Sequence, residues 1–568
     1  MPRRRLLIPI AVLVVLAPAG AYFLLRHKPE PPKPVPPKAE TRHQPTREEI
    51  IEAIEAGVEK LIELQQEDGS WKADDNTPVG ADGFRVGRTA LATQALLDAM
   101  RFVRCDNISQ SIHKGLTFIT QQWPEPKTYS AGLVLQAFHT ANSMKYSRWI
   151  NMYGWMACRG QMVYGPRAGS YTYGVFPFPK NFDKTMNYEP EKSAVSGRGD
   201  NSNTQFAMMA LLFAEKAGFQ IPKLTWLRAY KYYVASQHPD GGWDYQSDAF
   251  RGPAADNAIA PAPAYLSMTL AGTVSVDIAN ERLNAGQHDQ CKALTGNEPV
   301  ERGIEWLAKN FKGGADATPY AWWTCQRLGM RLGLSEIGGV DWYRAGADAL
   351  VGLVARGATA EGMPDLALSI IFLSRGLEPV IINKLKRAGD WDLHRHDIAH
   401  VVDYISEKGQ FAKQWRVVTL DASVDSLLRV PILWISGHDA LAFTDAEKRK
   451  LKEYVERGGT LLAEACCSKP EFDRSFRALM SELWPEGSLQ PLPEAHPIYD
   501  VPRPLRESKP VILAIGIAAQ QGRLGVLYLP HGISCQWERG GVKAYPAMDV
   551  AWNIVTCADQ YYQHYAPK

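Results

Sequence analysis

Two adjacent cysteines, Cys466 and Cys467, come nearest in type and position to a catalytic nucleophile. They directly follow an apolar run, 460–465, that predicts a buried strand, and His438 and His531 follow two other predicted strands. A thiol beside an imidazole base is the arrangement of a cysteine-dependent hydrolase, so this activity is one hypothesis for the C-terminal part of the chain.

The residues around the two cysteines argue against that chemistry. A nucleophile on a sharp strand-to-helix turn needs glycines beside it, and the run Glu464-Ala465-Cys466-Cys467-Ser468-Lys469 has none. We therefore predict no catalytic residue. Cys466 and Cys467 are instead expected to be buried structural residues, with Ser468 capping a helix that starts at Pro470.

Ligands of open α/β sheets bind beyond the carboxyl ends of the strands. Asp421, His438 and Glu464 lie at such predicted ends, so they form the candidate rim of a binding site. The cysteines are Cys105, Cys158, Cys291, Cys325, Cys466, Cys467, Cys535 and Cys557. Their spacing contains no zinc motif and no disulfide framework, so we predict no metal site and no cofactor.

The C-terminal third alternates short apolar runs with helical stretches, which predicts a largely parallel sheet covered by helices on both faces. The predicted strands are 380–385, 417–420, 432–436, 460–465, 511–517 and 525–529, and the predicted helices are 398–407, 445–457, 470–484 and 548–562. A tight turn at 520–523 predicts a hairpin between the last two strands.

Several short sequences in this region carry a family resemblance. They include Ser436-Gly437-His438, Gly458-Gly459-Thr460-Leu461-Leu462, Cys466-Cys467-Ser468, His496-Pro497-Ile498-Tyr499 and Gly522-Arg523-Leu524-Gly525. They resemble an uncharacterised bacterial domain family that is itself similar to the flavodoxin-like fold of class I glutamine amidotransferases. The resemblance implies an α/β fold for residues 377–568 and no established activity.

Residues 46–376 have helical periodicity and contain repeated segments. One helix leads to Gln66-Glu67-Asp68-Gly69-Ser70-Trp71, and another leads to Gln237-His238-Pro239-Asp240-Gly241-Gly242-Trp243. Glycine supplies the turn after the helix, glutamine can bond helix-end groups, and tryptophan packs over the joint. Arg198-Gly199-Asp200 lies just before an Asn-Ser-Asn-Thr stretch, 201–204, which we expect to cap a helix starting at Gln205.

These repeats resemble those of the squalene cyclase and prenyltransferase superfamily, whose fold is an α/α toroid. The D-x-D-D acid of terpene cyclases is missing here, because the nearest run reads Trp71-Lys72-Ala73-Asp74-Asp75. The GCGEQ thioester motif of complement-like toroids is absent as well. The resemblance therefore implies a toroid, and a non-catalytic one.

The N-terminal segment predicts a membrane anchor within residues 1–28. Arg3-Arg4-Arg5 precedes an uncharged run from Leu6 to Leu25, which is long enough to span a bilayer, and a proline-rich spacer fills residues 29–45. A cleaved signal peptide is the alternative, since Ala17-Pro18-Ala19 resembles a cleavage site. We expect a single-pass protein of the bacterial cell membrane with its body outside the cytoplasm, in the periplasm.

Composition narrows the remaining classes of function. The 568 residues carry 63 Lys and Arg against 61 Asp and Glu, a net charge of +2 that predicts no nucleic-acid partner. We predict a non-catalytic binding or scaffolding protein with an envelope protein or glycan as partner. Two alternatives stay open: a toroid enzyme acting on an isoprenoid or glycan, and the cysteine-dependent hydrolase.

Overall fold

The computed structural model describes residues 44–72, 84–181, 198–246, 262–285, 295–314, 317–409, 412–505 and 509–565. The predicted anchor and nearly all of the proline-rich spacer lie outside these ranges. None of the described helices is long and apolar enough to cross a membrane.

The first part of the described chain is helical up to Gly376. Its helices are α1 (Arg47–Leu64), α2 (Arg85–Ala99), α3 (Ile108–Gln121), α4 (Thr128–Asn142), α5 (Ser147–Arg159), α6 (Asn201–Lys216), α7 (Lys223–Ser236), α8 (Leu266–Asn284), α9 (Glu298–Asn310), α10 (Pro319–Leu332), α11 (Trp342–Arg356) and α12 (Met363–Gly376). A short hairpin, β1 (Glu336–Ile337) and β2 (Val340–Asp341), separates α10 from α11.

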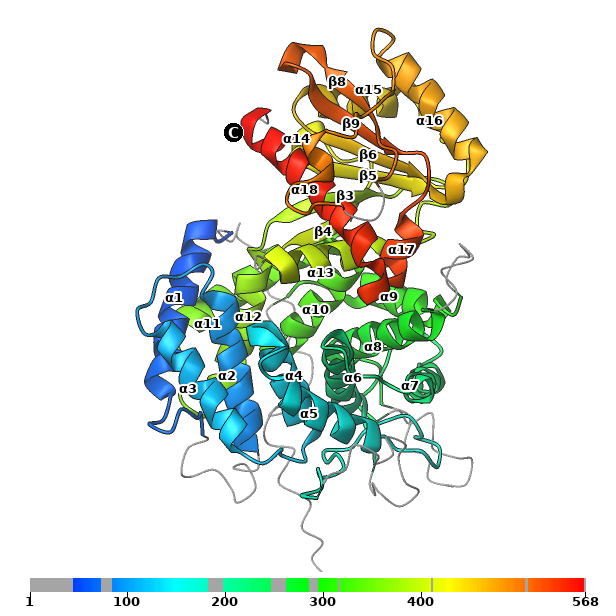
Figure 1. Cartoon of the computed structure of the whole chain (residues 1–568). Coiled ribbons are helices and arrows are strands. Elements are labelled where there is room, and N and C mark those ends of the chain that lie inside the picture. The colour runs from blue at the N-terminus through cyan, green and yellow to red at the C-terminus, as the bar shows by residue number, and fades with distance from the viewer. Residues whose placement is uncertain are drawn as a thin grey trace, which may run out of the picture.

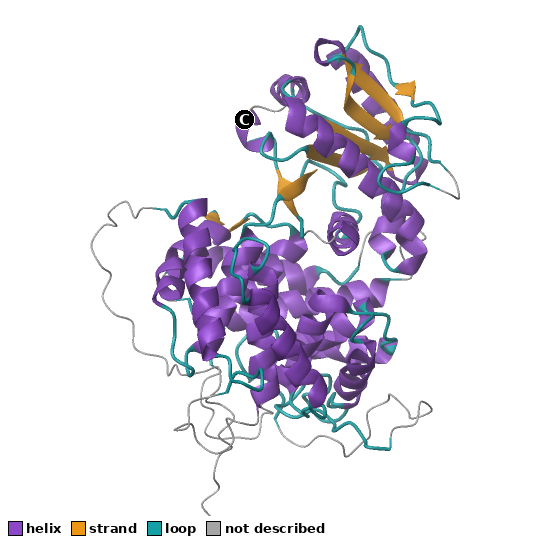
Figure 2. Cartoon of the chain, turned by 60° about the vertical axis from the view of Figure 1, so that its left-hand side comes forward, coloured by secondary structure: helices purple, strands orange, loops and turns teal. Residues whose placement is uncertain are grey.

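These helices form two concentric layers, which we call the barrel. Figure 2 shows them gathered into one predominantly helical body. The even-numbered helices contact one another in the order α2, α4, α6, α8, α10, α12 and α2 again, so they close a ring. The odd-numbered helices pack around that ring. Burial explains the division: α2 is buried at every position from Val86 to Ala99, whereas outer helix α3 buries one face.

The repeated segments make the same contacts in both copies. The Gln65 side chain donates to Gly69 O at 3.0 Å and to Ser111 O at 3.0 Å, and Gln237 donates to Gly241 O and Pro299 O, each at 2.9 Å. The indoles of Trp71 and Trp243 each donate to a carbonyl ten residues earlier. Gln65, and not the predicted Gln66, is therefore the counterpart of Gln237.

Capping boxes expected from the patterns Thr46-x-x-Glu49 and Thr444-x-x-Glu447 are confirmed, whereas the cap expected at 201–204 is wrong, because those residues lie within α6. Thr46 and Thr444 each form a capping box, with Glu49 and Glu447 respectively. Asp200 accepts a hydrogen bond from the backbone N–H of Asn203 and caps α6, which gives Arg198-Gly199-Asp200 a structural role.

The second part of the chain, from Val380 onward, forms a seven-stranded sheet in the order β4-β3-β5-β6-β9-β8-β7. The strands are β3 (Val380–Leu385), β4 (Gln414–Val418), β5 (Ile432–Gly437), β6 (Thr460–Ala465), β7 (Gln490–Pro491), β8 (Leu513–Ile517) and β9 (Arg523–Leu529). All neighbours from β4 to β9 are parallel, while β8 is antiparallel to both β9 and β7. The predicted hairpin is thus present as β8–β9.

Helices cover both faces of this sheet, and we call the whole unit the sheet region. One apolar core lies against α13 (Asp397–Gly409), α17 (Ser534–Arg539) and α18 (Tyr545–Tyr565). The other lies against α14 (Val424–Leu427), α15 (Asp445–Glu456) and α16 (Pro470–Leu483). The predicted α/β sandwich with a mostly parallel sheet is therefore observed.

The sheet region sits on one end of the barrel, with α13 and α17 facing α8, α9 and α10 (Figure 1). Edge strand β4 also contacts the barrel directly, because Val417 N donates to Gly333 O at 2.8 Å. The Trp415 ring packs so closely on Gly333, which has a φ of +64°, that a side chain there would clash with it.

Candidate metal centre

The site lies where the strand order of the sheet reverses. β4 is on one side of β3 and β5 is on the other, so this is the point where α/β sheets commonly bind ligands, beyond the carboxyl ends of the strands. His394 follows β3, His438 follows β5, Cys466 follows β6, and Cys535 follows β9 in the first turn of α17. The topology therefore gathers thiols and imidazoles from separate loops.

His394, Cys466 and Cys535 form a compact triangle. His394 Nε2 lies 3.3 Å from Cys466 Sγ and 3.3 Å from Cys535 Sγ, and the two sulfurs are 3.9 Å apart. His394 is 2% exposed and Cys466 is 0% exposed. Zn–S bonds of about 2.3 Å and Zn–N bonds of about 2.0–2.1 Å place ligand atoms of a tetrahedral site about 3.5–3.8 Å apart, close to all three edges of this triangle.

A second group overlaps this triangle. His438, Cys466 and Cys467 have ligand atoms within 4.8 Å of one another, as do the three members of the triangle. His438 is half-buried and Cys467 is exposed, so this group lies on the outer side of Cys466. The two groups share only Cys466, and Cys467 is in a disulfide bond, so this second group does not by itself complete the coordination of an ion in the triangle.

The two thiols of the triangle have opposite acidities. The hydrogen bond from Cys466 and the neighbouring His394 lower the pKa of Cys535 to about 5. The hydrogen bond to Cys535, together with burial, raises the pKa of Cys466. Burial disfavours the charged form of His394, but its hydrogen bond to Cys535 and the charge of that residue outweigh burial and raise its pKa. At neutral pH the cluster thus already contains a thiolate, the form that binds metals.

Glu464 fixes the helix that presents Cys535. Its carboxylate accepts hydrogen bonds from Ile533 N at 2.8 Å, from Ser534 N at 3.0 Å and from the hydroxyls of Ser534 and Ser436. This predicted rim residue therefore ties β5 and β6 to the start of α17. Because its oxygens already accept these bonds, Glu464 acts as a structural tie and is poorly suited to be a general base.

The turn after β6 is strained. Cys467 and Ser468 adopt positive φ values of 53° and 55°, which side-chain-bearing residues rarely take. Gly532 packs against this turn, and a Cβ atom there would lie 2.5 Å from Cys467 N. The turn thus reaches a sharp geometry without the glycines that the sequence argument required.

Buried Lys384 of β3 holds the loop that carries His394. Its ammonium group donates to His394 O and pairs with Asp397 at 2.9 Å and Asp392 at 3.1 Å. Burial disfavours the charged form of Lys384, but these two carboxylates outweigh it and raise its pKa. The loop therefore rests on a charged anchor within the sheet.

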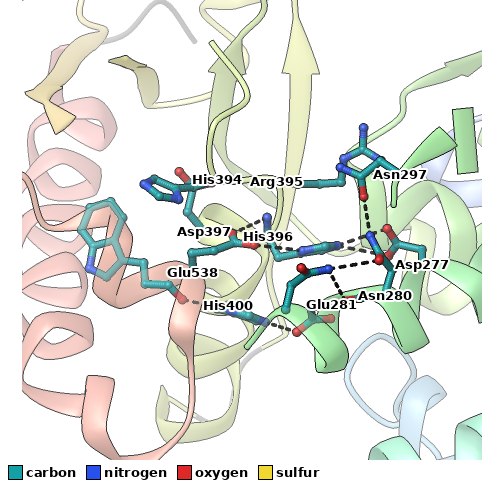
Figure 3. Close-up of polar contacts among 12 residues, drawn as sticks. Asp277, Asn280, Glu281, Asn297, His394, Arg395, His396, Asp397, His400 and Glu538 are labelled. Carbon is teal, nitrogen blue, oxygen red and sulfur yellow. Dashed lines mark hydrogen bonds and ion pairs between the residues drawn. The ribbon is translucent and has the colours of Figure 1, made fainter. Parts of the chain in front are cut away.

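The same loop is bound to the barrel through His396 (Figure 3). His396 Nε2 lies 3.1 Å from Asp277 of α8, and its Nδ1 lies 3.2 Å from Glu538, one turn after Cys535 on α17. Burial disfavours the imidazolium, but the facing carboxylates raise the pKa of His396 to about 10. His396 therefore bridges α17 and the barrel as a cation.

Two further ties flank His396. Arg395 pairs with Glu301 of α9, and His400 lies 2.9 Å from Glu281 of α8 and 2.9 Å from Trp537 O of α17. On the barrel side, Arg331 of α10 pairs with both Asp277 and Glu281. The barrel thus holds the two elements that carry His394 and Cys535.

The structure separates the remaining predicted site residues. His531 Nδ1 lies 3.4 Å from Ser468 Oγ, and Asp421 accepts a hydrogen bond from Thr419 at 3.1 Å. The prediction of burial holds for Cys466 but is wrong for Cys467. Ser468 is not the cap of α16, because Lys469 occupies that position without a side-chain bond, although Pro470 does start the helix.

His394 and Cys535 were not among the residues predicted from the sequence, so the cluster was not predicted either. They lie 72 and 69 residues from Cys466 in the chain, and zinc motifs are recognised by short spacings. The available signal was topological: Cys535 follows the last parallel strand, and His394 follows the first.

Comparison with known proteins finds a family model that matches part of the chain, within the sheet region. Residues 381–558 match the family described as Domain of unknown function (DUF4159). No curated protein matches the chain.

Three solved structures resemble the chain weakly. The apo form of a variant of the type II terpene cyclase MstE from Scytonema has 14% identity, covers 55% of this chain and 78% of its own, and has a TM-score of 0.33. An inactive variant of the α-1,6-mannanase GH76A of Salegentibacter sp. HEL1_6, in complex with α-1,6-mannotriose, has 10% identity and a TM-score of 0.39. The match covers 57% of this chain and 98% of the mannanase chain. A second MstE variant, in complex with geranylgeranyl dihydroxybenzoate, has 13% identity and a TM-score of 0.34. The match covers 58% of this chain and 99% of the MstE chain.

Proposed function

We propose that the sheet region binds a thiophilic divalent metal ion, zinc above all, through His394, Cys466 and Cys535. The observation that carries the proposal is the triangle of ligand atoms, whose edges of 3.3, 3.3 and 3.9 Å match one face of a tetrahedral zinc site. A water molecule would complete the coordination, as it does in zinc sites with three protein ligands. Glu464, Lys384 and His396 hold the ligand-bearing elements in place, as the outer partners of metal ligands do.

A second candidate function is thiol chemistry at Cys535. The lowered pKa of Cys535 and its contact with His394 favour this activity, which would move the nucleophile of the predicted hydrolase from Cys466 or Cys467 to Cys535. The hydrogen bonds of Glu464 argue against thiol chemistry. The Glu464 carboxylate accepts them from the start of α17, so it is not free to orient the His394 imidazole. Metal binding therefore ranks first.

The experiment measures metal content of the full-length protein. Protein purified without chelator should contain about one zinc per chain by mass spectrometry of the metal, and cobalt(II) should replace it with thiolate-to-metal absorption. Cys466→Ser and Cys535→Ser should lose the ion. Cys557→Ser, on α18 outside the cluster, should keep it.

The outcomes separate the two candidates. Retention of zinc in both cluster variants would refute the metal site. Absence of bound metal combined with rapid alkylation of Cys535 at neutral pH would instead establish thiol chemistry.

The wider role that we propose is binding or scaffolding in the bacterial envelope, outside the cytoplasm, by a chain tethered through residues 1–28. The charged run before Leu6 and the length of the apolar run to Leu25 support the tether. Similarity of the sheet region to glutamine amidotransferases, and an isoprenoid or glycan substrate for the barrel, remain alternatives within this proposal. Protease access to the body from the periplasmic side tests the topology, and recovery of the intact chain in the soluble cytoplasm would refute it.

A further inference from the structure

A large cavity lies at the junction of the barrel and the sheet region, on the face of the sheet opposite α13. Its volume is about 1240 Å³, and it is lined by the start of α1, the segment from α10 to α11, strands β3 and β4, and α14. Five cationic and three acidic side chains line it. The lining therefore carries an excess of positive charge.

Two neighbouring side chains face this cavity without a partner. Asn383 of β3 and Arg416 of β4 are register partners in the parallel ladder, so their side chains lie side by side on one face of the sheet. Both residues line the cavity, and Asn383 is only 2% exposed. Within the described residues, neither the Asn383 amide nor the Arg416 guanidinium has a hydrogen-bond or ion-pair partner. Buried polar groups are normally hydrogen-bonded, so the buried Asn383 amide, beside the half-buried Arg416 guanidinium, requires an explanation.

The charges around Arg416 strengthen that requirement. Arg344 and Arg429, which also line the cavity, oppose its charge, while Asp341 is the carboxylate that favours it. Asp341 already pairs with Arg344 at 3.5 Å. The local balance is therefore cationic, and an anion would relieve it.

We propose that this cavity binds a ligand through a phosphate or carboxylate group held by Arg416 and Asn383. A guanidinium donates two parallel hydrogen bonds to such groups, and the Asn383 Nδ2 supplies a further donor beside it. The volume exceeds the usual range of about 300–1,000 Å³ for small-molecule sites, so the anionic group belongs to a larger molecule. This second site does not depend on the metal centre.

Calorimetry on the full-length protein at low salt tests the site, with inorganic phosphate and glucuronate as probes. Arg416→Gln and Asn383→Leu should each weaken binding about ten- to a hundredfold, because each removes hydrogen bonds to a charged group. Arg474→Gln is the matched control, since Arg474 is an exposed arginine of α16 outside the cavity, and it should bind as the unaltered protein does. If either variant fails to fold, Arg429→Gln replaces it, because Arg429 is exposed at the cavity lining and should weaken binding without loss of the fold.

Two lipid probes distinguish the sources of the anion. Tighter binding of dihexanoyl phosphatidylglycerol than of phosphate, with no binding of dihexanoyl phosphatidylcholine, would identify a lipid head group. Equal or tighter binding of phosphate or glucuronate would identify a soluble or glycan-borne anion. Failure of all anionic probes to bind, or unchanged binding in Arg416→Gln and Asn383→Leu, would overturn the proposal.

Discussion

His396 and Asp277 form a buried ion pair that joins the sheet region to the ring of the barrel, with 3.1 Å between Nε2 and Oδ2. His396 is two residues from His394, and it also binds Glu538 on the helix that carries Cys535. A single side chain thus connects the barrel with both elements that present ligands of the candidate metal centre.

Replacing Asp277 by Asn should lower the free energy of unfolding by about 3–5 kcal/mol, because His396 and Arg331 then lose a buried counter-charge. Zinc affinity should fall on the order of ten- to a hundredfold as the loop carrying His394 loosens. Denaturant unfolding and chelator competition measure the two effects. Asp403→Asn is the control, because the ion pair of Asp403 with Lys216 also joins the sheet region to the barrel. In that pair the Asp403 side chain is 53% exposed and the Lys216 side chain 25%, so this substitution should lower the free energy of unfolding by about 1 kcal/mol or less. Equal losses in both variants would contradict the prediction.

Gly532→Ala should distort the turn after β6, because the added Cβ would lie 2.5 Å from Cys467 N. We expect a loss of about 1–3 kcal/mol in stability, as for other overpacked sites, together with weaker zinc binding. Gly352→Ala is the matched control: Gly352 is an exposed residue of α11, where alanine should be neutral or stabilising. Unchanged melting temperature and zinc content in Gly532→Ala would show that the turn tolerates the side chain.

Stability should depend on pH through Glu125. Burial raises its pKa from 4.5 to about 7 in the folded chain. Between these values the unfolded chain has released the Glu125 proton, while the folded chain still binds it. The protein is therefore most stabilised by this group below pH 4.5, and the stabilisation is lost as the pH rises to about 7. The full effect is at most about 3 kcal/mol. Melting temperatures of Glu125→Gln across this range should fall less than those of the unaltered protein, and parallel curves would refute the assignment.

The paired glutamines of the barrel repeats offer a test of their equivalence. Gln65→Ala and Gln237→Ala each leave two carbonyls without their donor, so each should cost about 1–3 kcal/mol. Gln66→Ala, which removes a single bond to nearby Leu64 O, should cost less. Chemical denaturation compares the three variants, and a larger loss for Gln66→Ala would restore the register that the sequence suggested.

Local patterns in the sequence predicted much of the sheet region. The strand 460–465 and the helix starting at Asp445 coincide with β6 and α15, because a continuous apolar run and a capping box are determined by neighbouring residues. β4 begins earlier than predicted, at Gln414, because this residue pairs with Val380 of β3, which is 34 positions earlier in the chain. The short strand β7 and helix α17 were missed, because elements of this length carry little periodicity of their own.

The candidate centre was predictable only in part. Cys466 and His438 were placed correctly at strand ends, whereas their assembly with His394 and Cys535 depends on the order of strands in the sheet. That order is not encoded in any short motif of this chain. The junction cavity was equally hidden, because it exists only where Arg416 and Asn383 are brought against the barrel.

The hydrogen bond from Val417 to Gly333 bears on how the chain avoids self-association. An uncovered edge strand is a template for pairing with other chains. In this protein the barrel covers β4 at one edge of the sheet, while the other edge ends in β7, two residues long and closed by Pro491. The sheet region severed from the barrel would expose the β4 edge and should form aggregates. The barrel therefore protects the sheet region from self-association as well as positioning it.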